Sequence, residues 1–144
     1  MSSKKSTLRR RMCTKAEPSE LAVIRRFVEE VAVSANLRNS RVFDLKVAVS
    51  EACANAVEHA GRNRGQLEVT ALHTCGRLTF EILDTGAFHV PEADLASRRE
   101  NRGLGLPLMV ALMDEVNISR LREEGTRVTL SVFLDHPVEA ADTG

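Results

Sequence analysis

The feature that most restricts the fold of this chain is a change in the spacing of its apolar residues after Ala60. Before that point, apolar residues recur every three or four positions, as at Leu21, Ile24, Phe27, Val28 and Val31. This spacing predicts helices that each have one apolar face. After Ala60, apolar and polar residues alternate over residues 67–71 and 78–82, which predicts strands with one buried face. Helices that precede strands in this way favour an α+β fold.

The helical half contains two predicted helices, and a short strand is expected before them over residues 6–14. The second helix is predicted over residues 41–60. Asn39 or Ser40 can cap its start, because their side-chain oxygens can accept the first free N–H groups. Gly61 is well placed to end it.

The second half is predicted to form two hairpins. Gly76 separates the strands of the first hairpin, and a turn at residues 123–125 separates those of the second, which begins at Val116. Between the hairpins, residues 85–102 lack apolar periodicity, as functional lids and disordered loops do. Residues 104–113 are apolar enough for a buried helix. We expect a two-layer α/β sandwich in which a mixed, mostly antiparallel sheet carries its helices on one face.

The composition fits a single cytoplasmic domain. Its 144 residues can bury a real core, so we expect one domain over residues 1–144, with its core at about 7–134 and with a flexible basic start and a frayed C-terminal tail. No apolar run approaches the ~18 residues that span a bilayer, and no apolar segment follows the basic start, which argues against secretion. That basic start could touch RNA or an acidic partner, but a solvated tail and a charged edge strand explain it better.

Charge and cysteine content exclude further classes. The net charge is zero, so the whole-molecule field does not favour nucleic acid. The three cysteines, Cys13, Cys53 and Cys75, are too few and too scattered for a metal site or a disulfide framework. A reduced, cytoplasmic protein is therefore expected.

A polar stripe interrupts the apolar segment at residues 45–60. Glu51, Asn55 and His59 recur every fourth residue and so lie along one side of the predicted helix. Burying an amide without a partner costs about 2–7 kcal/mol, so the stripe indicates a wet cavity that holds a ligand. The amide oxygen of Asn55 suits Mg²⁺, and the carboxylate of Glu51 can accept a proton. An exposed helix face is the alternative, and the surrounding alanines, valines and Cys53 make it less favoured.

Three later signals are each weak alone. Asp84-Thr85-Gly86 ends a predicted strand; it is either an ordinary turn or a buried acceptor for an exocyclic amine, with close access for a base ring at Gly86. Gly103-Leu104-Gly105-Leu106 opens a predicted helix, whose free N–H groups can hold phosphates, or is a hinge. Gly125-Thr126 begins the last strand, where the hydroxyl could bond to Asp84 or to a ring nitrogen, or where Thr simply suits a strand.

Together, these motifs resemble the GHKL, or Bergerat-fold, ATPase superfamily. The resemblance rests on the order and spacing of Glu51-x-x-x-Asn55, Asp84-x-Gly86, Arg102-Gly103-x-Gly105 and Gly125-Thr126. It is greatest for a small single-domain branch, the anti-sigma factor serine/threonine-protein kinases of the RsbW/SpoIIAB type. It runs from about residue 7 to residue 134, and residues 50–59, 102–106 and 113–116 carry it most strongly.

The resemblance implies a role for each matching residue. Glu51 would be the general base, and Asn55 would hold Mg²⁺ against the phosphates of ATP. Asp84 would receive the adenine amine, helped by Gly86 and Thr126. The remaining residues would surround the nucleotide, with phosphates on the glycine backbone and charge from the arginine: His59, Arg102, Gly103, Leu104, Gly105 and Leu106.

The resemblance also implies partners. Such a protein binds an alternative sigma factor and transfers the γ-phosphoryl group of ATP to a serine of a STAS-domain anti-anti-sigma antagonist, usually as a cytoplasmic homodimer. Direct contact with nucleic acid or with a membrane is not expected.

One departure from the family pattern leaves a second function open. The family motif continues Asp-x-Gly-x-Gly-Phe, whereas this chain reads Asp84-Thr85-Gly86-Ala87-Phe88. The alternative function is therefore a nucleotide-binding partner-switching module without kinase activity. A histidine-kinase catalytic domain from a larger receptor fits less well, since no phospho-acceptor helix hairpin precedes the fold and the lid is short.

Overall fold

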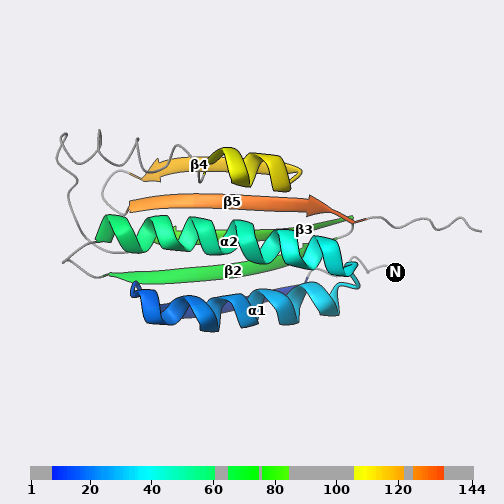
Figure 1. Cartoon of the computed structure of the whole chain (residues 1–144), viewed down its shortest axis with the longest axis horizontal. Coiled ribbons are helices and arrows are strands. Elements are labelled where there is room, and N and C mark those ends of the chain that lie inside the picture. Colours follow the sequence, from blue (N-terminus) through cyan, green and yellow to red (C-terminus); the bar gives the residue numbers. More distant parts are fainter. Residues whose placement is uncertain (1–7, 61–64, 75, 85–105, 122–124, 135–144) are drawn as a thin grey trace, which may run out of the picture.

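The computed structural model describes residues 8–60, 65–74, 76–84, 106–121 and 125–134, which form one sheet and the helices that cover it (Figure 1). The elements in chain order are β1 (Leu8–Lys15), the short 3-10 helix η1 (Pro18–Glu20), α1 (Leu21–Ser34), α2 (Asn39–Ala60), β2 (Gln66–Thr74), β3 (Arg77–Asp84), a helix over residues 106–112, β4 (Glu115–Leu121) and β5 (Gly125–Phe133).

The sheet has five strands in the order β1-β2-β3-β5-β4. Met12 lies opposite Val69, Val69 opposite Ile82, and Ile82 opposite Val128. Residues that face each other across antiparallel strands lie on the same side of the sheet, so this row gives the sheet an apolar face. Every pairing between the described strands is antiparallel. The predicted antiparallel character is confirmed, but the expectation of a mixed sheet is wrong for these strands.

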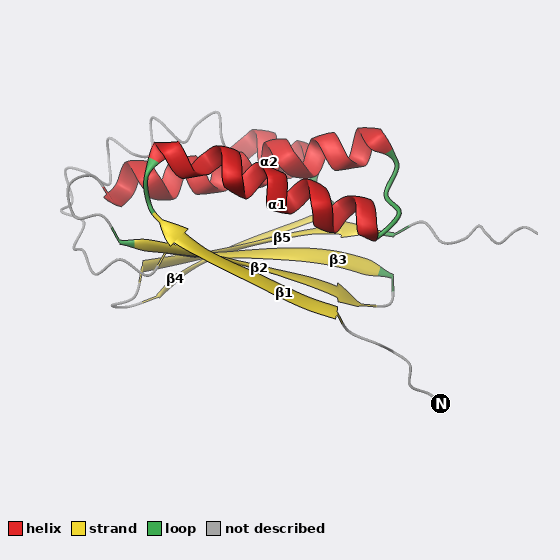
Figure 2. Ribbon diagram, turned by 90° about the horizontal axis from the view of Figure 1, so that it is seen from below, coloured by secondary structure: helices red, strands yellow, loops and turns green. Residues whose placement is uncertain are grey.

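The described helices all cover the apolar face, and no described element covers the other face of the sheet (Figure 2). α1 runs above β1 and β2, α2 lies over the centre, and the 106–112 helix lies over the β4 side (Figure 1). The core forms between the two layers, where helices and strands contribute fully buried side chains: Ile24, Val28, Leu45, Val49, Leu67, Val69, Leu78, Phe80, Ile82, Met109, Leu130 and Val132. The predicted α+β two-layer sandwich is confirmed.

One prediction about α2 needs correction. The helix begins at Asn39, so Asn39 and Ser40 lie in its first turn and do not cap it. The reason is that the carbonyl of Arg38 already accepts the N–H groups of Arg41 and Val42, at 2.9 and 3.0 Å. In the apolar segment that was singled out, residues 45–57 are all buried or partly buried, and the next residue is exposed.

Other expectations concern residues that the structure does not describe. They are the helix end at Gly61, the lid at residues 85–102, the hairpin turn and the two termini. Among the described residues, no helix has both the length and the apolar character needed to cross a bilayer.

Candidate functional site

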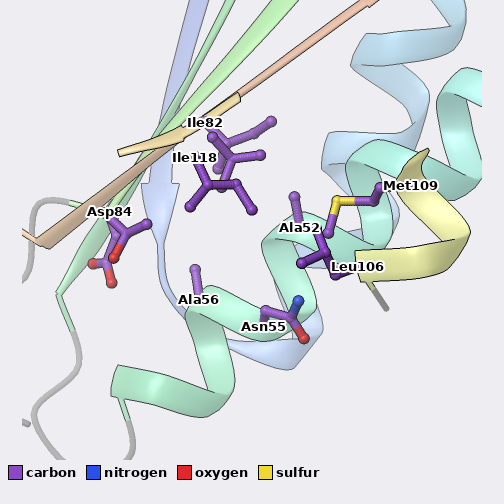
Figure 3. Close-up of a pocket in the computed structure, with 10 residues that line it drawn as sticks. Ala52, Asn55, Ala56, Ile82, Asp84, Leu106, Met109 and Ile118 are labelled. Atoms are coloured by element: carbon purple, nitrogen blue, oxygen red, sulfur yellow. The ribbon is translucent and has the colours of Figure 1, made fainter. Parts of the chain in front are cut away.

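A cavity lies between α2, the sheet and the 106–112 helix (Figure 3). It is open to solvent, and the empty space in it, with part of that open solvent included, is about 490 Å³. Its lining is mostly apolar, and its three polar residues are Asn55, Asp84 and Thr126. The apolar residues of the lining are Ala52, Ala56, Ile82, Leu106, Met109, Ile118 and Val128. An apolar cavity with a few fixed polar groups is the usual form of a small-molecule site.

One wall of the cavity comes from α2. Asn55 and Ala56 follow Ala52 by three and four residues, so both lie on the face of the helix that carries Ala52. The two alanines leave space between helix and sheet, and Asn55 places an amide beside that space (Figure 3). Glu51 lies one turn before Asn55 and is half-buried, but it does not line the cavity.

The opposite wall comes from the ends of β3 and β5. Asp84 is the last residue of β3, and its alternation with Ile82 brings the carboxylate to the helix-covered face. Only 2% of Asp84 is exposed. The β3–β5 register pairs Ile82 with Val128, and both side chains line the cavity with Thr126. A carboxylate in such surroundings is a directional acceptor for an N–H group of a ligand.

Gly125 allows β5 to start directly against the end of β3. Its φ is +101°, a conformation that L side chains rarely adopt. A Cβ atom at this position would overlap the carbonyl oxygen of Asp84. The glycine before Thr126 therefore has a structural role: it lets the backbone that carries Thr126 approach Asp84.

The 106–112 helix supplies the third wall through Leu106 and Met109. Met109 is buried, whereas Leu106, Leu108 and Val110 are 37%, 38% and 58% exposed. The prediction of a buried helix is therefore only partly right. The helix rests on one side against the other elements, and its apolar residues continue around to the solvent side.

Cys53 follows Ala52 in α2 but points into the core and not into the cavity. Burial raises the pKa of its thiol from 9.0 to about 12. The thiol therefore stays protonated at neutral pH and behaves as a small apolar group. This side chain is not a candidate nucleophile.

The structure brings together four of the predicted site residues: Asn55, Asp84, Leu106 and Thr126 line one cavity. Glu51 lies next to them along α2. The backbone of His59 lies in the last turn of α2, one turn beyond Asn55. The other predicted residues lie outside the described part of the chain, and their roles stay predictions: Gly86, Arg102, Gly103, Leu104 and Gly105.

The apolar lining was not predicted as part of the site. It consists of Ala52, Ala56, Ile82, Met109, Ile118 and Val128. Periodicity does carry a signal for two of them, since Ile82 precedes Asp84 by two residues and Val128 follows Thr126 by two. Ile118 lies opposite Val128 in β4, and that pairing follows only from the sheet register.

Comparison with known proteins identifies the family. Residues 14–132 match the histidine kinase-like ATPase domain. This chain belongs to that family. The predicted resemblance to GHKL ATPases is thereby confirmed, and the sheet and its helices are those of a histidine kinase-like ATPase fold.

Curated relatives place the chain near one branch of the family. It is 33% identical over 143 residues to the serine-protein kinase RsbW of Bacillus pumilus (strain SAFR-032), covering 89% of this chain and 87% of that protein. It is 32% identical over 133 residues to the serine-protein kinase RsbW of Bacillus subtilis (strain 168), covering 83% and 82%. These names agree with the predicted serine kinase class.

A solved structure supports the fold. The crystal structure of the RsbU and RsbW domains of Rv1364c from Mycobacterium tuberculosis matches with a TM-score of 0.64 and 22% sequence identity. The match covers 87% of this chain and 31% of that longer chain.

The site also suits a metal ion that arrives with a nucleotide. The described residues hold no group of three or more His, Cys, Asp or Glu side chains that could bind a metal by themselves. Mg²⁺ bound to a nucleotide needs only one or two protein oxygens, because phosphates and water supply the rest. The amide oxygen of Asn55, at the cavity, is a suitable ligand of this kind.

Proposed function

We propose that this chain is an ATP-dependent anti-sigma factor with serine kinase activity. It binds an alternative sigma factor and phosphorylates a serine of a STAS-domain anti-anti-sigma antagonist. The observation that carries the proposal is the cavity that holds Asn55 and Asp84 on facing walls. The similarity of nearly the whole chain to serine-protein kinases supports it.

Each described residue has a distinct task in this proposal. Asp84 accepts a hydrogen bond from the adenine amine, and Thr126 adds a hydroxyl beside it. The apolar lining, including Ile82 and Met109, packs against the base. Asn55 holds Mg²⁺, which when bound neutralises phosphate charge during phosphoryl transfer.

Glu51 acts as the general base. The oxygen of the acceptor serine forms a bond to the γ-phosphorus, the bond from that phosphorus to the bridging oxygen of ADP breaks, and the serine proton passes to the Glu51 carboxylate. The position of Glu51, one helical turn from Asn55, supports this assignment because the reacting phosphoryl group lies near the metal.

The test is phosphoryl transfer by a Glu51→Gln variant. The chain is mixed with radiolabelled ATP, Mg²⁺ and candidate STAS proteins from the same genome, and ATP affinity is measured in parallel by calorimetry. We expect transfer to fall at least about 100-fold, whereas the affinity for ATP stays within about threefold. Glu58→Gln is the matched control, because Glu58 is an exposed acid on the same helix. Undiminished transfer by Glu51→Gln would remove Glu51 as the base, and the absence of ATP binding at millimolar ATP would remove the whole proposal.

A second function is a nucleotide-binding partner-switching module without kinase activity. Two observations favour it: Glu51 does not line the cavity, and the motif at Asp84 lacks its second glycine. A wild-type chain that binds ATP and a sigma factor but transfers no phosphate to any STAS protein would establish this function.

The oligomeric state and the location belong to the same proposal. We propose a cytoplasmic homodimer, as the resemblance implies. Light scattering of the purified chain measures the oligomeric state, and a mass near twice the 15.9 kDa of the chain is expected.

A further inference from the structure

Arg41, in the first turn of α2, contacts the end of the 106–112 helix that is remote from the cavity. Its Nη1 atom donates to the carbonyl oxygen of Leu112 at 2.9 Å and to Oδ2 of Asp44 at 3.0 Å. Its Nη2 atom donates to Oδ2 of Asp114 at 3.1 Å. The Leu112 carbonyl ends the helix, so it lacks a partner within the helix and carries partial negative charge. The guanidinium satisfies this helix end.

Asp114 joins the same guanidinium to the sheet. Its Oδ2 atom also accepts the backbone N–H of Phe133 at 2.7 Å, and its own N–H donates to the carbonyl of Ser131 at 2.9 Å. The β4–β5 ladder ends where Glu115 faces Ser131, so Phe133 lies beyond it. The Asp114 carboxylate therefore takes the place of a missing strand partner. We call the contacts of Arg41 with Asp44, Leu112 and Asp114 the Arg41 clamp.

The 106–112 helix is short and partly exposed, so a contact at its end adds to its stability. Seven helical residues span only about 10 Å, and a helix this short is not stable alone. Of its side chains, Met109 is fully buried, whereas three apolar neighbours are at least a third exposed. Arg41 and Asp114 are partly shielded, with side chains 28% and 35% exposed. The clamp thus adds a directional restraint at the end of the helix opposite the cavity, where Leu112 and Met113 also pack against the core.

We propose that the Arg41 clamp positions the 106–112 helix for nucleotide binding, an inference that rests on the proposed ATP-binding function. Leu106, at one end of the helix, lines the cavity and directly follows the Gly103-Leu104-Gly105 sequence; the other end is held by Arg41. Arg41 shares α2 with Asn55, so the clamp fixes the spacing between two walls of the same cavity. Arg41 is a positioning residue and does not touch the nucleotide.

The experiment compares Mg-ATP binding by the full chain and by three variants, using calorimetry at a temperature where thermal melts show all of them folded. Arg41→Ala is expected to weaken binding about three- to tenfold. Arg41→Lys should recover part of the affinity, because its ammonium group still faces the helix end. Lys46→Ala is the matched control: Lys46 is on the same helix and pairs with Glu29 of α1 at 3.3 Å, away from the 106–112 helix.

The pattern of results decides between positioning and general stability. Weaker binding by Arg41→Ala, with Lys46→Ala like wild type and Arg41→Lys in between, supports the clamp. Wild-type affinity in Arg41→Ala, or an equal loss in Lys46→Ala, overturns it. An absence of ATP binding by the wild-type chain overturns the proposed function and this inference with it, whereas the other outcomes leave the proposed function intact.

Discussion

The Asp84 carboxylate is set among apolar side chains, and in the proposed function this contrast selects the base of the nucleotide. Ile82, Ile118 and Val128 line the same cavity and can form no hydrogen bond with a base. A planar ring that enters it can therefore be oriented by the few polar groups present. An ionised carboxylate accepts hydrogen bonds and donates none. In the proposed function, Asp84 therefore favours a ring edge that donates, as the amine of adenine does.

Asp84→Asn is expected to weaken ATP binding by at least about tenfold, because a hydrogen bond to a charged group contributes about 1.5–3 kcal/mol. The amide can also donate to a ring carbonyl, so the preference for ATP over GTP should narrow. Competition binding with both nucleotides measures the two effects. Glu81→Gln is the control, since Glu81 belongs to the same strand but faces the other side of the sheet. An unchanged ATP affinity in Asp84→Asn would contradict adenine recognition by this residue.

The position of Glu51 shows what residue spacing can and cannot predict. A four-residue interval correctly predicts that Glu51 and Asn55 lie on the same side of α2. Ala52, which follows Glu51, lines the cavity, so the cavity reaches this level of the helix. Glu51 is turned about 100° around the helix axis from Ala52 and lies to one side of the cavity wall. Sequence gives the approximate side of a helix, but how much of that side a cavity covers depends on the strands opposite it.

Among the elements, the closeness of β3 and β5 at the cavity depends on one backbone position. Gly125 starts β5 beside the carbonyl of Asp84, in a conformation that favours glycine. Gly76, in the β2–β3 hairpin, has a similar φ of +84° but no atom within 4 Å of the place where a Cβ would be. A side chain at Gly76 would therefore meet backbone strain alone, whereas a side chain at Gly125 would meet both backbone strain and steric overlap.

Gly76→Ala is expected to cost about 1–2 kcal/mol of unfolding free energy, the strain of a left-handed backbone. Gly125→Ala should cost about 3 kcal/mol or more, since the overlap with Asp84 forces the strands apart as well. Urea unfolding of both variants measures the difference. Equal losses would mean that β5 can shift away from β3 without cost.

Strands were easier to predict than helix burial. Alternation located β2, β3 and β5 because the residues on the face under the helices are buried or partly buried in each strand. The 106–112 helix was predicted as more buried than it is, since apolar content does not show where a layer ends. Phe43 in α2 and Val110 in the 106–112 helix are apolar yet mostly exposed, at positions that sequence alone does not distinguish from the core.

For the molecule as a whole, burial of Cys53 links stability to alkaline pH. Its pKa is about 12 in the folded chain and 9.0 when the thiol is unperturbed. The unfolded chain therefore loses this proton first as the pH rises, and the native state is destabilised by up to about 1.4 kcal/mol per pH unit between these values. Below pH 9 the full contribution is present.

Cys53→Ala should remove this part of the pH dependence. We expect the unfolding free energy of wild type to fall more steeply than that of the variant from about pH 9 upward, as measured by urea titrations at several pH values. Cys13→Ala, which changes an exposed thiol, should follow wild type. Parallel curves for Cys53→Ala and wild type would mean that the thiol is not shielded in solution.

The order of the strands was the least predictable property of the whole molecule. Turn signals at Gly76 and near Gly125 predicted the β2–β3 and β4–β5 hairpins, which the structure contains. No local signal pairs β3 with β5 or β1 with β2, since these contacts join distant segments. Yet the β3–β5 pairing is the one that places Asp84 near Thr126. The most important contact of the site is thus the least visible in the sequence.

The pairing of β1 also affects the order in which the strands of the sheet can form during synthesis. Leu8 faces His73 and Lys15 faces Gln66, so each β1 residue pairs with a residue more than fifty positions later in the chain. Closing so long a loop is slow compared with forming a hairpin. During synthesis β1 emerges first, but it has nothing to bind until β2 has followed. The earliest strand to be made is therefore among the last to be completed, and until then its row of arginines, Arg9, Arg10 and Arg11, keeps an unpaired edge soluble.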